Sequence, residues 1–131
     1  MPRSTARSLG RPGCGEGCGI DILSPMSEPQ VVPFPVTAVE PEAPGIASRA
    51  VQINGVRWAI VQYEPGVLRE EWCEEGHSGY VLDGEVSYEF QDCRAVLAVR
   101  EGEGFTLPDG SGHRGRAGAD GARLFLIDRA G

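Results

Sequence analysis

Apolar and polar residues alternate over much of the chain after residue 50, and this pattern predicts β-strands. Val56, Trp58 and Ile60 recur at every second position of the segment 56–63, and a shorter alternating run covers 51–53. Side chains spaced two apart lie on one face of a strand. Asn54-Gly55 separates the two runs, and both residues tolerate the positive φ angles of a two-residue turn. We therefore predict a β-hairpin from 51 to 63.

Short alternating or apolar runs separated by glycine-centred turns continue to the end of the chain. Further strands are predicted at 67–72, 79–82, 85–90, 95–99, 105–107, 114–117 and 122–127. Asp83-Gly84 and the segment 118–121 are expected to be turns between successive strands. About eight to ten short strands without a convincing helix indicate an all-β sandwich or barrel, and a jelly roll is the natural closed form at this size.

The pattern divides the chain into three parts. Residues 1–25 are rich in Gly, Ser, Arg and Pro, and we expect them to be disordered, or to lie upstream of a true start at Met26. Five prolines between 27 and 47 exclude a long helix and predict an extended arm, with one short strand near 31–32 or 36–39. The barrel is expected to span 48–129.

Composition supports one globular domain. The chain has 131 residues, of which 40% are hydrophobic, with 19 Gly and 10 Pro. A net charge of −7 argues against a protein that binds a nucleic-acid backbone. The sequence contains no apolar run long enough to cross a bilayer. No apolar signal segment follows the first arginines, so we expect a cytoplasmic protein with reduced cysteines.

The chain has only two histidines, and the second closes a spaced run of glycine and proline. Gly102, Pro108, Gly110 and His113 stand at the spacings Gly-x5-Pro-x-Gly-x2-His. This run resembles the second motif of the cupin superfamily, with Ala117 in place of its closing asparagine. The resemblance covers about residues 50–128 and implies a cupin jelly-roll barrel.

The region around the first histidine is similar to the first cupin motif, in which two histidines and a glutamate precede a closing glycine. If Gly84 is the closing glycine, the glutamate position falls on His77 and the two histidine positions fall on Cys73 and Glu71. The leading glycine would be Gly66. In the family these positions, together with the second-motif histidine at His113, hold a divalent metal inside the barrel.

The resemblance therefore implies a metal site made of Glu71, Cys73, His77 and His113. Thiolate, imidazole and carboxylate all bind Zn²⁺, whereas two histidines and one carboxylate also suit non-haem Fe(II). The thiolate favours Zn²⁺ or an iron that tolerates sulfur. Residues 71 and 73 would share a face if they lie on a strand. Glu71 and Tyr80 are candidates for proton transfer.

Each of these residues also has a structural interpretation. Cys73 can be a small buried apolar residue, His77 a hydrogen-bonded residue at the barrel mouth, and Glu71 part of a solvated acidic cluster. A disulfide between Cys73 and Cys93 is disfavoured in reducing cytosol. Cys14 and Cys18 have no further cysteine and no histidine nearby in the sequence that would complete a metal site. Two interpretations also apply to three arginines, which either hold an anionic substrate or are simply solvated: Arg57, Arg114 and Arg116.

Three functions remain open from the sequence. The first is a small metal-binding cupin enzyme, of the isomerase or oxygenase type, acting on a small organic molecule inside the barrel. The second is a non-catalytic module that senses a ligand or a metal, and the third is a metal-free isomerase-type barrel. Because open sheet edges and faces favour association, we expect a homodimer. We expect neither a nucleic-acid nor a membrane partner.

Overall fold

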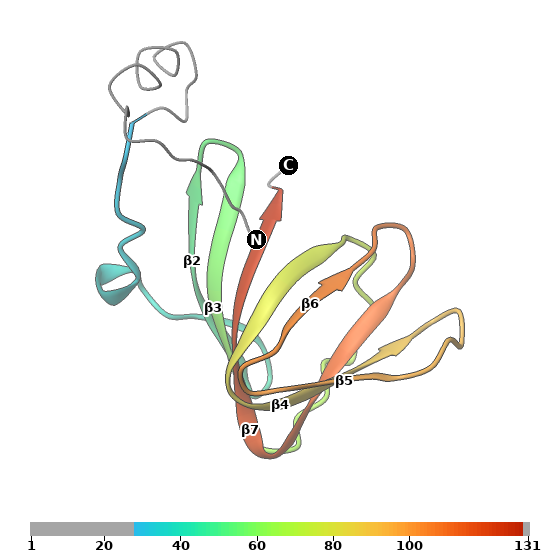
Figure 1. Cartoon of the computed structure of the whole chain (residues 1–131). Coiled ribbons are helices and arrows are strands. Elements are labelled where there is room, and N and C mark those ends of the chain that lie inside the picture. Colours follow the sequence, from blue (N-terminus) through green and yellow to red (C-terminus); the bar gives the residue numbers. More distant parts are fainter. Residues whose placement is uncertain (1–27, 130–131) are drawn as a thin grey trace. The chain divides into compact units, whose positions relative to one another are not determined.

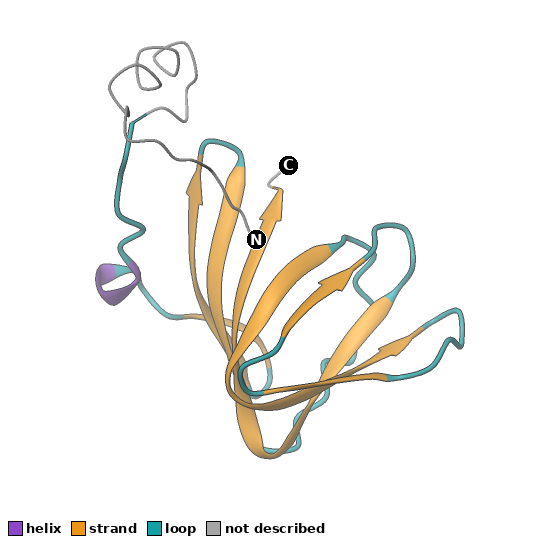
Figure 2. Cartoon of the chain, viewed as in Figure 1, coloured by secondary structure: helices purple, strands orange, loops and turns teal. Residues whose placement is uncertain are grey.

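The computed structural model describes residues 28–129, and Figures 1 and 2 show that strands are its main regular structure, joined by loops and accompanied by one short helical turn. Residues 28–31 belong to a separate unit and contain no helix or strand. Within the described range, the elements are η1 (Phe34–Val36), β1 (Glu40–Ala43), β2 (Ile46–Ile53), β3 (Val56–Tyr63), β4 (His77–Phe90), β5 (Leu97–Arg100), β6 (Gly104–Leu107) and β7 (His113–Arg129). No helix in this range has the length and apolarity needed to cross a membrane.

The predicted hairpin is confirmed as β2 and β3. Asn54 and Gly55 have φ angles of 51° and 79°, which are the positive values that the turn requires. The antiparallel pairing runs without a break from Ile53 opposite Val56 to Ile46 opposite Tyr63. The strand β2 therefore begins at Ile46, two residues before the predicted start of the barrel.

The strands form one antiparallel sheet that bends over on itself. Its order is β1-β2-β3-β7-β4-β5, and β6 pairs with β4. Figure 1 shows that the long strands β4 and β7 curve, so that they belong to both halves of the folded sheet. Alternate side chains point inward and form the core, whose fully buried members include Val61, Val81, Val86 and Leu124. The architecture agrees with the predicted all-β jelly roll.

The two long strands correct the prediction of shorter strands with turns between them. Residues expected to be two strands joined at Asp83-Gly84 form the continuous strand β4, and the segment 118–121 lies within β7. The pairing of β4 with β7 shifts register between Val81 and Asp83 and again between Gly84 and Val86. A glycine in a bulge and a glycine in a turn give the same sequence signal, so alternation alone did not separate them.

The segment between β3 and β4 also differs from the prediction. A strand was expected at 67–72, but the structure has only isolated bridges there, from Leu68 to Arg116 and from Cys73 to His113. The prediction of a short strand near 31–32 or 36–39 is wrong: the strand of the proline-rich arm is β1, at Glu40–Ala43, on the edge of the sheet next to β2. Residues 1–25, with Cys14, Cys18 and the proposed start at Met26, lie outside the described residues.

Candidate metal centre

Cys73 and His113 are held side by side by the backbone. The amide of each residue donates a hydrogen bond to the carbonyl of the other, both at 2.9 Å, and the two residues form an isolated antiparallel bridge. Directly opposed residues in such a pair project their side chains to the same face. The bridge therefore brings a thiol next to an imidazole although 40 positions separate them in the sequence.

His77 is positioned by the pairing between β4 and β7. Its neighbour Ser78 pairs with Ile127. Continuing this antiparallel register by one residue places Asp128 opposite His77. The Nδ1 atom of His77 lies 2.7 Å from Oδ1 of Asp128, a carboxylate whose side chain is only 11% exposed. An ionised carboxylate only accepts hydrogen bonds, so Nδ1 carries the proton. In the neutral ring, Nε2 then keeps a free lone pair.

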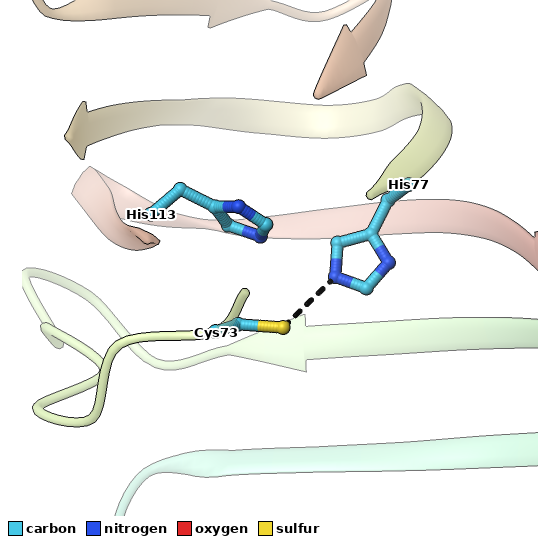
Figure 3. Close-up of side chains that lie close together, drawn as sticks. All are labelled: Cys73, His77 and His113. Carbon is cyan, nitrogen blue, oxygen red and sulfur yellow. Dashed lines mark hydrogen bonds between the residues drawn. The ribbon is translucent and has the colours of Figure 1, made fainter. Parts of the chain in front are cut away.

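The three side chains meet at one point. Figure 3 shows Cys73, His77 and His113 pointing toward one another from separate segments. The Nε2 atom of His77 lies 3.5 Å from the Cys73 sulfur, and one ligand atom from each residue lies within 4.8 Å of the other two. The two imidazole rings meet edge to face, with centroids 5.0 Å apart. The cluster offers one sulfur and two nitrogen donors to a single point.

His113 is buried in a way that requires an explanation. The residue is 2% exposed, and its Nδ1 atom has no hydrogen-bond partner among the described residues. Burial, with a smaller contribution from the nearby His77 ring, lowers the pKa of His113 to about 4. The ring is therefore neutral at neutral pH, which is the form that binds metals. An unpaired buried polar atom is uncommon, and a functional site is one of its recognised causes.

The structure leaves the other two predicted site residues outside the cluster. Glu71 is exposed, and the segment that carries it is not a strand. Tyr80 is 44% exposed on the outer surface of β4. Cys73 and Cys93 are both free cysteines, so the disfavoured disulfide between them is absent.

A cavity of about 150 Å³ adjoins the cluster. Cys73, His77 and His113 form part of its wall, and the aromatic rings of Tyr63 and Tyr88 form another part. The Tyr88 ring meets that of His113 edge to face at 5.8 Å. Burial raises the pKa of Tyr88, so this phenol stays neutral beside the histidine. The arrangement provides room for a small molecule in contact with the three donors.

A network of charged side chains completes the cavity wall. Glu42 accepts hydrogen bonds from Arg69 at 2.6 Å and from Arg57 at 3.3 Å. A second Arg57 nitrogen lies 3.7 Å from Asp128, the partner of His77. Burial alone would raise the pKa of Glu42. Hydrogen bonds from Ser48 and Arg69, together with the arginine charges, outweigh that effect and lower the pKa below its usual value.

Three residues of this charged network were not found from the sequence. Glu42 lies where the pairing of β1 with β2 is irregular, between Pro41 and Ala43, and such bulges redirect a side chain in a way that alternation does not predict. Arg69 lies in the segment without regular pairing. For Asp128 a signal existed, because it continues the inward series of Leu124 and Leu126 at period two.

Comparison with known proteins identifies the fold. No protein-family model and no curated protein matches the sequence. An RmlC-like cupin from Shewanella frigidimarina is 16% identical, with a TM-score of 0.60 over 71% of this chain and 83% of that one. KdgF from a Halomonas species is 19% identical, with a TM-score of 0.58 over 72% of this chain and 87% of that one.

A larger protein matches as well. Bacillus subtilis oxalate decarboxylase, described with Mn(II) centres, is 23% identical with a TM-score of 0.64, over 95% of this chain and 37% of that protein. This chain thus spans little more than a third of the decarboxylase. The similarities confirm the predicted fold: the chain has the jelly-roll fold of these cupins.

Proposed function

We propose that this protein is a small metal-binding cupin that holds one divalent ion through Cys73, His77 and His113 and acts on a small organic molecule in the adjoining cavity. The observation that carries the proposal is the convergence of these three donors within 4.8 Å, with the far nitrogen of His77 bound by Asp128. Histidines that bind metals commonly donate their other N–H to a carboxylate in this way.

The residues fit a metal in distance and in chemistry. Sulfur at about 2.3 Å and nitrogen at about 2.0–2.1 Å from one tetrahedral zinc ion are about 3.6 Å apart. The Cys73 sulfur and His77 Nε2 lie 3.5 Å apart. Three protein ligands also leave the fourth position free, which is the arrangement of catalytic rather than structural zinc sites.

The donor set distinguishes between metals. Thiolate sulfur is a soft ligand that suits zinc and iron, whereas manganese favours carboxylate and water oxygens. The neighbour with Mn(II) centres therefore does not predict the metal of this chain. We propose Zn²⁺, with a thiolate-bound Fe(II) as the second choice. When bound, such an ion supplies Lewis-acid polarisation of a substrate oxygen, and iron would also supply oxygen chemistry.

The side chains around the cavity define what the protein itself contributes. Glu42 is the carboxylate that faces the cavity, and its lowered pKa keeps it ionised and able to accept a hydrogen bond. Tyr63 and Tyr88 present aromatic surface to the same space. We therefore propose that Glu42 orients the ligand through a hydrogen bond, and the proton-transfer role that the sequence suggested for Glu71 and Tyr80 is not transferred to it.

Metal content tests the proposal. The untagged full chain, Cys73→Ser and His113→Ala are purified in parallel, and zinc, iron, manganese and nickel are measured by elemental analysis. Cys93→Ser is the matched control, because Cys93 is an exposed free cysteine outside the cluster. We expect about one metal ion per chain in wild type and Cys93→Ser, and a loss of at least tenfold in the other two variants.

Two results would overturn the metal site. One is equal metal content in all four proteins, and the other is a wild-type protein that remains metal-free after incubation with zinc and iron. The second result would leave a metal-free barrel. Native mass spectrometry of the same preparations then addresses turnover: an enzyme releases a converted molecule, whereas a sensing module retains its ligand unchanged.

A further inference from the structure

The arginines of the cavity wall suggest which class of molecule the site accepts. Three guanidinium groups line the cavity, those of Arg57, Arg69 and Arg114. Two of them were candidates from the sequence, whereas the third candidate, Arg116, is exposed on β7 and does not line the cavity. We propose that the cavity binds a small organic monoanion through the carboxylate of that ligand, with Arg69 and Arg57 as the anion-binding residues. This inference rests on the proposed metal site.

Charge balance is the first argument. The three arginines are matched by three carboxylates: Glu42 pairs with Arg57 and Arg69, Asp128 lies beside Arg57, and Glu89 pairs with Arg114. The protein side chains alone are therefore neutral. A divalent ion held by one thiolate and two neutral imidazoles adds one uncompensated positive charge. In a partly enclosed cavity an unbalanced charge is costly, and one anionic ligand removes that cost.

The second argument concerns hydrogen-bond donors. A guanidinium group carries five N–H donors. The hydrogen bonds of Arg57 and Arg69 to Glu42 use one donor each, and Arg69 uses another toward the side chain of Tyr63. The contact of Arg57 with Asp128, at 3.7 Å, is longer than a hydrogen bond. Both arginines therefore retain donors at the cavity wall, and planar guanidinium groups match carboxylates in a two-bond geometry.

Cavity size limits the ligand. The volume of about 150 Å³ corresponds to roughly five water molecules at about 30 Å³ each. Acetate and glycolate fit this space, with a carboxylate on the arginines and the remaining atoms toward the metal cluster. Glu42 occupies part of the same arginine surface, so it competes with an incoming carboxylate. This competition predicts effects of opposite sign for changes at Glu42 and at Arg69.

Calorimetric titration of the zinc-loaded full chain tests the proposal. Acetate and glycolate are compared with acetamide and glycolamide, which have nearly the same shape but no charge. We expect the anions to bind at least tenfold more tightly than the amides. Arg69→Gln and Arg57→Gln should each weaken acetate binding at least tenfold with zinc content unchanged, whereas Glu42→Gln should tighten it several-fold. Arg116→Gln is the control and should bind as wild type does.

The possible failures are distinguishable. Amides that bind as tightly as the anions, or acetate binding that both arginine variants leave unchanged, would overturn the anion site while zinc content still supports the metal site. A zinc-loaded protein that binds no carboxylate would also overturn it. If wild type takes up no metal, the titration is repeated on the metal-free chain. Acetate binding that depends on Arg69 would then retain the anion site alone, and its absence would end both proposals.

Discussion

At the scale of single residues, the candidate site depends on how one histidine is oriented. The carboxylate of Asp128 fixes the proton of His77 on Nδ1, and Nε2 is then directed at the Cys73 sulfur. Without that hydrogen bond, the ring could rotate or take its other tautomer, and Nε2 would present a proton instead of a lone pair. Asp128 is thus a positioning residue for the proposed metal ligand rather than a ligand.

Replacement of Asp128 should weaken metal binding without removing a ligand. We expect Asp128→Ala to reduce zinc affinity about 10–100-fold, measured by competition with a chelator of known affinity. Asp128→Glu should recover part of the loss because it restores an acceptor. Glu89→Ala removes a carboxylate that pairs with Arg114 and does not touch His77, so it serves as the control. Equal zinc affinity in Asp128→Ala and wild type would refute the positioning role.

The site residues show what the sequence could and could not provide. The spacing of His113 and the comparison with cupin motifs brought Cys73, His77 and His113 into one hypothesis, and the structure does bring them together. Glu71 was included because the first cupin motif places a histidine position there. It lies outside the cluster, on a segment that forms only isolated bridges. The position of Glu42 at the cavity depends on an irregular strand pairing. The position of Asp128 beside His77 depends on the register between strands that are distant in sequence. Local sequence patterns encode neither.

At the scale of the elements, the long strands β4 and β7 determine the shape of the barrel. Alternation predicted the β2–β3 hairpin correctly because Asn54-Gly55 between two alternating runs commonly forms a two-residue hairpin turn. It failed for β4 because a glycine such as Gly84 can reverse a chain or let a paired strand bend. In the structure Gly84 has a φ of 79°, and a Cβ placed on it would collide with the carbonyl of Gly121 on β7.

Gly84 should therefore be far less replaceable than a glycine in an open turn. Gly102 is the matched control, since its φ is 89° but nothing lies within 4 Å of the place of its Cβ. The positive φ alone costs about 1–2 kcal/mol in Gly102→Ala, and the collision with backbone should add about 1–3 kcal/mol in Gly84→Ala. Urea unfolding measures both. Equal losses of stability would mean that β4 and β7 do not approach as closely as described.

At the scale of the whole molecule, the three proposed ligands come from three separate segments of the chain. Cys73 belongs to the irregular segment between β3 and β4, whereas His77 begins β4 and His113 begins β7. The segment around Cys73 forms no strand of its own, but backbone hydrogen bonds already attach it to β7, among them Arg69 N–H to the carbonyl of Gly115 and Ala117 N–H to the carbonyl of Val67. A metal bound by all three residues would fasten this segment to the start of both long strands.

Metal removal should consequently lower the stability of the whole domain. A ligand that binds only the folded state stabilises it by RT ln(1 + [L]/Kd), which is about 2.7 kcal/mol at a hundredfold excess over Kd. For a domain of this size, 1 kcal/mol shifts Tm by about 4–8 °C. We therefore expect a chelator to lower the Tm of wild type by roughly 10–20 °C, and added zinc to restore it.

Cys73→Ser should melt at the same temperature with and without chelator, because it lacks the thiolate. A wild-type Tm that does not respond to chelator or zinc would contradict a metal that fastens these segments, since binding to the folded state cannot leave stability unchanged.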